Sequence, residues 1–179
     1  MWAELTRNML LAGAGVAVAT AVLLPRPSAV LLAVAAVACV DVMLFGLMGL
    51  AGVRFNSISV VNLVMAVGLS VDYAIHVLHA FVQTPGESPV GRMRDALRTI
   101  GPSVALGGLT TFLGILPMAG SSSTIFRTFF TMLSGTVGLG LLVALVLLPA
   151  LLSVAGPAYV PAGSPAAGAA PAGGASAVC

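Results

Sequence analysis

The run ISVVNLVMAVGLSVDYAIHV, residues 58–77, is apolar or small at almost every position up to Val71 and then carries Asp72. The apolar segment around it is long enough for a transmembrane helix, which needs about 20 such residues. Placing a charged carboxyl group near the centre of a membrane helix costs about 2.5–3.5 kcal/mol. An acid kept at such a position is expected to be functional, so Asp72 is the first candidate site residue.

Two neighbours share a helix face with this acid. Gly68, Asp72 and His76 follow one another at intervals of four residues, which places them on one side of an α-helix. The face therefore combines a small residue that permits close packing, an acid that can bind a proton, and an imidazole. Because histidine titrates in the physiological pH range, this combination suggests a proton relay inside a membrane transporter.

The composition independently indicates a membrane protein. Hydrophobic residues make up 59% of the 179 residues and charged residues 7%, whereas about a quarter of a soluble domain is charged. The net charge of +2 is too small to suggest a nucleic-acid partner. Cys39 and Cys179 lie too far apart in sequence to suggest a metal site or a disulfide framework. We expect an all-α polytopic membrane protein with no cofactor.

Five apolar segments are long enough to cross a membrane. They cover approximately residues 8–24, 28–53, 57–82, 99–119 and 129–154, and would form one bundle over residues 8–155. The first segment is rich in alanine and could instead be a cleaved signal peptide. Residues 1–7 would be an extracytoplasmic stub. Residues 156–179 are mostly Ala, Gly and Pro and predict a disordered tail.

The connection between the third and fourth segments, residues 83–98, is the one substantial polar loop. Ser88-Pro89 is a favourable helix start, because proline suits the first helical turn. Met93, Leu97 and Ile100 then recur on one face, which predicts a short amphipathic helix on the membrane surface at about 89–98. A plain solvated connector is the alternative. The connections at 25–27 and 54–56 predict tight reversals.

Arginine positions suggest how the chain is oriented. One set of alternate loops holds four arginines, Arg26, Arg92, Arg94 and Arg98, and the other holds three, Arg7, Arg54 and Arg127. Cytoplasmic loops carry an excess of basic residues. Because three arginines cluster in the 83–98 connection, we expect that loop and the C-terminal tail in the cytosol. The N-terminus would then be lumenal or extracellular.

Glycines within the apolar segments predict where helices approach closely, since small residues allow backbones to pack in lipid. Most would be generic packing positions, whereas Gly68 is expected to pack at the relay itself. The others are Gly46, Gly49, Gly52, Gly107, Gly108, Gly114, Gly135, Gly138 and Gly140.

Residues 56–76, with their Gly-x-x-x-Asp pattern from Gly68 to Asp72, resemble the tenth transmembrane segment of the Patched, Dispatched and Niemann–Pick type C group. This group lies in the resistance-nodulation-division superfamily of transporters. The resemblance covers roughly residues 28–157. Its further parts are Ala96-Leu97, Gly101-Pro-Ser, Leu109-Thr-Thr-Phe112, Ile125-Phe-Arg-Thr-Phe-Phe130, Leu148-Pro-Ala-Leu-Leu-Ser153 and Gly156-Pro157.

The resemblance implies the eighth to twelfth helices of a twelve-helix transporter. Such proteins move sterols or other lipids, often coupled to protons or sodium ions through acids on the fourth and tenth helices. Asp72 occupies the tenth-helix position, and Asp72-Tyr73 is similar to the Asp-Tyr pair of bacterial lipid exporters. His76 matches a histidine that follows the acid in many members. Thr110 and Thr111 fall where the eleventh helix supplies a hydroxyl to the relay.

The sequence departs from the family pattern by lacking the first half, with its fourth-helix acid. We expect a fragment of a larger product, and the alternative is a chain that assembles with a separate first half. Its partners would be membrane lipids or sterols and that half. A non-transporting membrane partner, or a sterol-sensing half-protein, is the alternative function.

Asp41 is the second acid in mid-span. We expect a packing bond to a neighbouring helix, with cation binding between Asp41 and Asp72 as a weaker alternative. Two intramembrane aspartates also occur in aspartyl proteases, but those enzymes resemble one another in a Gly-x-Gly-Asp string. This chain instead has Leu-Ser-Val before Asp72, so we expect no enzyme activity.

Overall fold

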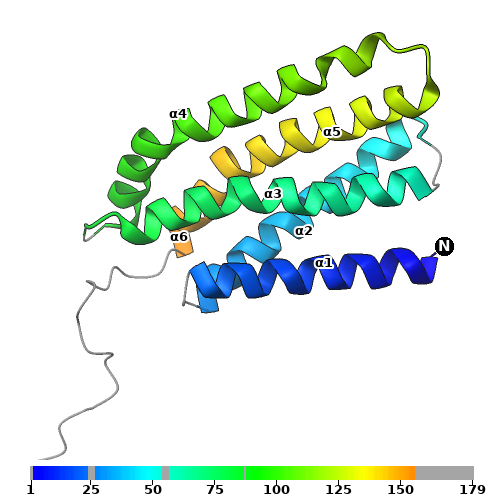
Figure 1. Ribbon diagram of the computed structural model, residues 1–179. Coiled ribbons are helices and arrows are strands. Elements are labelled where there is room, and N and C mark those ends of the chain that lie inside the picture. The colour runs from blue at the N-terminus through cyan, green and yellow to red at the C-terminus, as the bar shows by residue number, and fades with distance from the viewer. Residues whose placement is uncertain (1, 24–26, 54–56, 87, 156–179) are drawn as a thin grey trace, which may run out of the picture.

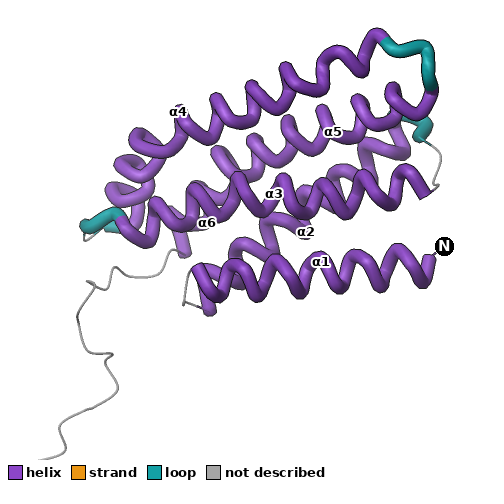
Figure 2. The backbone as a smooth tube through the Cα atoms, viewed as in Figure 1, coloured by secondary structure: helices purple, strands orange, loops and turns teal. Residues whose placement is uncertain are grey.

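A computed structural model describes residues 2–23, 27–53, 57–86 and 88–155, and these residues contain helices and no strands (Figures 1 and 2). Five helical segments are long and apolar enough to cross a membrane, which confirms the predicted polytopic all-α fold. The reversals predicted at 25–27 and 54–56 lie wholly or largely outside the described residues. The tail predicted at 156–179 lies wholly outside them.

The first three helices are α1 (Trp2–Leu23), α2 (Pro27–Leu50) and α3 (Ser57–Gln83). Helix α2 ends three residues before its predicted end because Gly52 adopts a φ of +64°, a conformation that glycine tolerates and that stops the helix. The Val53 N–H donates to the carbonyl of Met48 at 3.0 Å and closes the helix end. Thus the apolar pattern predicted the span, and backbone geometry determines its boundary.

Helix α4 (Pro89–Ile115) continues into the 3-10 turn η1 (Leu116–Gly120). Ser88 caps α4 as predicted, with its hydroxyl oxygen accepting from the Gly91 N–H at 3.5 Å. The residues predicted to form a short helix at 89–98 are helical, and they make up the first turns of α4. Whether those turns lie on a membrane surface stays a prediction. Figure 1 shows α4 changing direction near its start, and Pro102 lies within this helix.

The last span consists of α5 (Thr124–Leu142), the π-helical turn η2 (Val143–Leu147) and α6 (Leu148–Ala155). Pro149, at the second position of α6, has no N–H to donate to the preceding turn, and its ring needs room there. A wider turn directly before proline provides that room. The predicted span at 129–154 is therefore present but is locally unwound.

Helix α3 is the centre of the bundle. It packs against α1, α2, α4 and α5, and it lies between α1 and α4 in Figure 1. Half of its apolar window is buried, compared with 11% for α1 and for α4. A buried cluster that includes Val40, Tyr73, Val77 and Phe81 joins α2 and α3 to α4 and α6. The buried side chains of α3 are consequently held by several neighbouring helices.

Three of the predicted packing glycines make close contacts. A Cβ atom would lie 2.5 Å from Leu141 Cδ1 at Gly108, 2.2 Å from Leu47 Cδ2 at Gly135 and 2.9 Å from Tyr73 Cδ2 at Gly140. The packing role is thus confirmed for these three glycines. Open space surrounds the Cβ position at the others, among them Gly68.

Candidate functional site

Asp72, Tyr73 and His76 of α3 face a shared cavity between α3 and α4. Its volume is about 280 Å³. Leu69, Asp72, Tyr73 and His76 line it from α3, and Ile100, Ser103, Val104, Gly107 and Thr111 line it from α4. On each helix these positions recur at intervals of three or four residues, so two helix faces oppose each other across the cavity.

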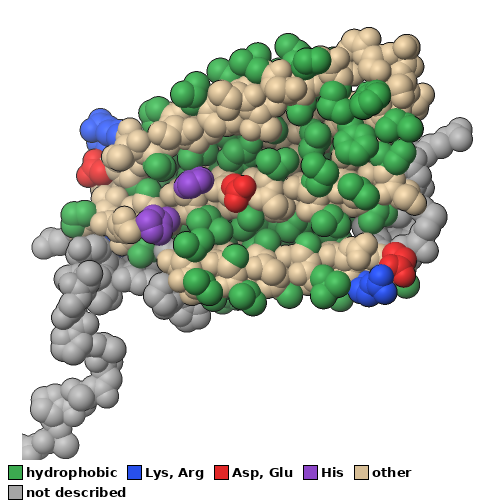
Figure 3. Space-filling view, in the orientation of Figure 1, with side chains coloured by type: hydrophobic (Ala, Val, Ile, Leu, Met, Phe, Trp, Pro, Cys, Tyr) green, Lys and Arg blue, Asp and Glu red, His purple; other side chains and the backbone are tan. Residues whose placement is uncertain are grey.

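Asp72 and His76 are exposed, and they stand on the face of α3 predicted from their spacing. In Figure 3 an acidic side chain and a histidine lie close together on this side of the molecule, with hydrophobic side chains around them. Gly68 is exposed on the same helix, and nothing lies within 4 Å of its Cβ position. The role of Gly68 in helix packing at the relay therefore stays a prediction.

Tyr73 is held much more tightly than its neighbour. Its side chain is 7% exposed, and its ring packs against Gly140 of α5. The Tyr73 hydroxyl is buried beside Thr111, yet no described residue forms a hydrogen bond of acceptable geometry with it. This hydroxyl is thus positioned at the cavity, beside Thr111.

The two threonines of α4 have different positions. Both hydroxyls donate to the carbonyl oxygen of Gly107, at 2.8 Å from Thr110 and 2.9 Å from Thr111. Only Thr111 lines the cavity. The structure therefore brings Asp72, Tyr73, His76 and Thr111 together, and it leaves Thr110 outside the cavity lining.

Sequence reasoning missed Ser103 and Gly107. Both precede Thr111 at intervals of four residues, so the helical period could have placed them on the threonine's face. Ser103 adds a hydroxyl to the cavity. With Asp72, Tyr73 and Thr111, it gives the cavity four side chains that carry oxygen. Among the described residues that line the cavity, none is a lysine or an arginine.

Asp41 lies apart from this cluster. It lines a smaller cavity with residues of α1, α2 and α3, and Asp72 does not line that cavity. Asp41 Oδ1 is buried with no hydrogen-bond partner among the described residues. The structure thus gives this oxygen no packing bond, and it does not bring the two acids to one cavity.

The described residues contain no group of three or more His, Cys, Asp or Glu side chains that could hold a metal ion. His79, one turn beyond His76, lies 3.0 Å from the Gln83 side-chain nitrogen at the end of α3.

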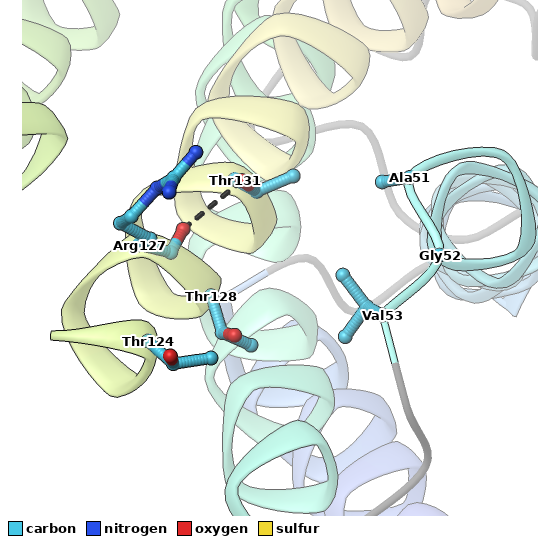
Figure 4. A pocket seen from close by; sticks show the side chains of 7 residues that line it. All are labelled: Ala51, Gly52, Val53, Thr124, Arg127, Thr128 and Thr131. Carbon is cyan, nitrogen blue, oxygen red and sulfur yellow. Dashed lines mark hydrogen bonds between the residues drawn. The ribbon is translucent and has the colours of Figure 1, made fainter.

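A further cavity, of about 370 Å³, lies where α2 ends and α5 begins (Figure 4). The α2 end contributes Ala51, Gly52 and Val53, and α5 contributes Thr124, Arg127, Thr128 and Thr131. Figure 4 shows Thr124 and Thr128 pointing from α5 toward Val53, and the Thr131 hydroxyl donating to the carbonyl of Arg127 at 3.0 Å. None of the predicted site residues lines this cavity.

Comparison with known proteins places the chain in a family. Residues 6–170 match the model of the MMPL family. The chain is 41% identical over 136 residues to human "Protein patched homolog 2", covering 75% of this chain and 11% of that protein. It is 42% identical over 123 residues to the pig "NPC intracellular cholesterol transporter 1", covering 68% of this chain and 10% of that protein.

A third relative is the "Niemann-Pick type C1-related protein" of Toxoplasma gondii, 38% identical over 135 residues that cover 75% of this chain and 12% of that protein. The chain thus spans about a tenth of the length of the curated relatives it matches. These similarities confirm the resemblance to the Patched and Niemann–Pick type C group. By its match over residues 6–170, the chain belongs to the MMPL family.

Proposed function

We propose that this chain is the membrane component of a transporter that moves sterols or other lipids and is driven by protons or sodium ions. One observation supports this above all: Asp72, Tyr73, His76, Ser103 and Thr111 line one cavity between α3 and α4, two helices that are long and apolar enough to cross a membrane. The similarity to a cholesterol transporter supports the lipid as the transported substrate.

Asp72 is proposed as the ion-binding carboxyl group. Intramembrane acids mark ion pathways in transporters. His76 is one helical turn away and can pass or accept a proton. The hydroxyls of Tyr73, Ser103 and Thr111 supply further oxygen atoms at the same cavity, which would suit a sodium ion as well as a proton. Binding of either ion changes the charge inside the membrane and can bias the packing of α3 against its neighbours.

The exposed face of α3 suggests how the chain is completed. Gly68, Asp72 and His76 remain exposed within a helix that is otherwise half buried. We propose that a six-helix first half covers this face, in the same polypeptide or as a separate chain. The N-terminus would then be lumenal or extracellular and the tail cytosolic, as the arginine distribution suggests.

An intramembrane protease is disfavoured by the position of the two acids. Aspartyl chemistry requires paired carboxyl groups, and Asp41 and Asp72 line separate cavities. We therefore propose no enzymatic role.

The test is lipid or sterol movement by the complete transporter in proteoliposomes. Either a proton or a sodium gradient is imposed, and each is then collapsed with an ionophore. The proposal expects movement that depends on one of the two gradients. Sterol-dependent association of the chain with no gradient-dependent movement would instead support the non-transporting or sterol-sensing alternative.

A further inference from the structure

Asp41 lies in a cavity of its own. The cavity has a volume of about 150 Å³ and is lined by residues of α1, α2 and α3. Besides Asp41, its lining includes Met9, Gly13 and Val16 of α1, Val34 and Val37 of α2, and Val67 of α3. All of these side chains are apolar, so one carboxyl group stands in an otherwise hydrocarbon-like space.

One oxygen of the half-buried Asp41 carboxyl group lacks the hydrogen-bond partner that a charged form would need. Asp41 Oδ1 is buried, and no described residue donates a hydrogen bond to it. No charged or titratable side chain from α1 or α3 lines the cavity among the described residues. Burying a charge without a partner is very unfavourable, so such a group is expected to bind something that removes the charge.

The residues that line the cavity favour a proton over a metal cation as the bound ion. A sodium ion inside a protein needs several oxygen ligands, as hard cations do generally. Apart from Asp41, the described lining offers no side-chain oxygen. A proton needs only one carboxyl oxygen. We infer that Asp41 is a proton-binding site that is separate from the Asp72 cluster.

The separation from Asp72 follows from the geometry of α3. Val67 faces the Asp41 cavity, whereas Asp72 faces the cavity shared with α4. Five residues of an α-helix correspond to a rotation of about 140°, so the two positions are on well-separated sides of α3. The helix thus stands between two acids with different surroundings: one has hydroxyls and an imidazole beside it, and the other has none.

Infrared spectroscopy of the full 179-residue chain in lipid nanodiscs tests this inference without a transport assay. The aspartate side chains carry a 13C label, and wild-type spectra are compared with those of Asp41→Asn and Asp72→Asn at neutral pH. We expect a protonated-carboxyl C=O band that is lost in Asp41→Asn and retained in Asp72→Asn. Replacing sodium by choline should leave that band unchanged.

The inference would be overturned if Asp41→Asn lost carboxylate bands and kept the C=O band. It would also be overturned if adding sodium removed the C=O band. A second measurement uses the unmodified chain and so does not depend on the folding of a variant. Dicyclohexylcarbodiimide, an apolar reagent for protonated carboxyl groups, should modify Asp41 and spare the exposed Asp95, as read by peptide mass spectrometry. An unmodified Asp41 peptide would contradict proton binding.

Discussion

Gly140 of α5 and Tyr73 of α3 pack so closely that a Cβ atom at position 140 would lie 2.9 Å from Tyr73 Cδ2 and 3.3 Å from Cε2. The backbone of Ser70 follows at 4.0 Å on the same side. The last span therefore fixes the position of the tyrosine ring, and with it the hydroxyl beside Thr111. A residue far away in sequence thus helps to shape the candidate ion site.

Replacing Gly140 by alanine should displace the Tyr73 ring. We expect Gly140→Ala to destabilise the bundle by about 1–3 kcal/mol, the usual range for overpacking, and to weaken ion dependence of transport. Thermal unfolding in detergent and gradient-driven lipid movement are the two measurements. Gly138→Ala is the matched control, because nothing lies within 4 Å of that Cβ position. Equal effects of the two substitutions would contradict the role assigned to the Gly140 contact.

Thr111 and Thr110 provide a second matched pair. Each hydroxyl donates to the Gly107 carbonyl, so replacing either one by valine removes the same local hydrogen bond. Only Thr111 lines the cavity with Asp72. We expect Thr111→Val to lower the affinity for the coupling ion by up to about tenfold, the worth of one hydrogen bond of roughly 0.5–1.5 kcal/mol. Thr110→Val should leave it unchanged.

The coupling-ion concentration that gives half-maximal transport measures this difference. A larger effect of Thr110→Val than of Thr111→Val would show that the cavity is not the ion site.

Arg92 should contribute mainly to stability. Its side chain is 1% exposed and donates to the carbonyl of Phe81 at 2.9 Å and to that of Thr84 at 3.0 Å. The guanidinium also lies 4.3 Å from the centre of the Phe81 ring. Hydrogen bonds from charged groups contribute about 1.5–3 kcal/mol each. We therefore expect Arg92→Ala to destabilise the chain by roughly 3 kcal/mol or more.

Chemical unfolding in detergent checks this value, with the exposed Arg94 replaced by alanine as the control. Arg92→Lys should recover little of the loss, because a lysine ammonium cannot reproduce the planar donor geometry of arginine. Similar unfolding of the two alanine variants would mean that the carbonyl contacts of Arg92 add nothing to stability.

The sequence predicted the features that depend on local patterns. The lengths of the apolar segments predicted the five spans, and Ser88-Pro89 predicted a helix start at the position where α4 begins. The four-residue spacing placed Asp72 and His76 together on α3. Such features depend on the spacing of residues along a helix and on the length of an apolar segment, and both can be read from the sequence.

Features that depend on contacts between helices were missed. Arg92 was expected in a polar loop, but the carbonyls of Phe81 and Thr84 accept hydrogen bonds from its guanidinium and allow it to be buried. Thr110 and Thr111 are adjacent in sequence, and only the packing of α4 against α3 shows that Thr111 is the one that lines the cavity. The π-helical turn before Pro149 accommodates the proline ring. The surrounding residues are apolar, and their composition alone does not predict such a turn.

Asp72→Asn in the complete, reconstituted transporter tests the central claim most directly. Asparagine keeps the shape of the side chain but removes its negative charge and cannot take up a proton. Asp95→Asn is the control, because Asp95 is an exposed acid on α4 outside the cavity. We predict that Asp72→Asn abolishes gradient-driven lipid movement at normal expression, whereas Asp95→Asn transports normally. Undiminished gradient-driven movement by the Asp72→Asn transporter would contradict the assignment of Asp72 as the ion-binding group.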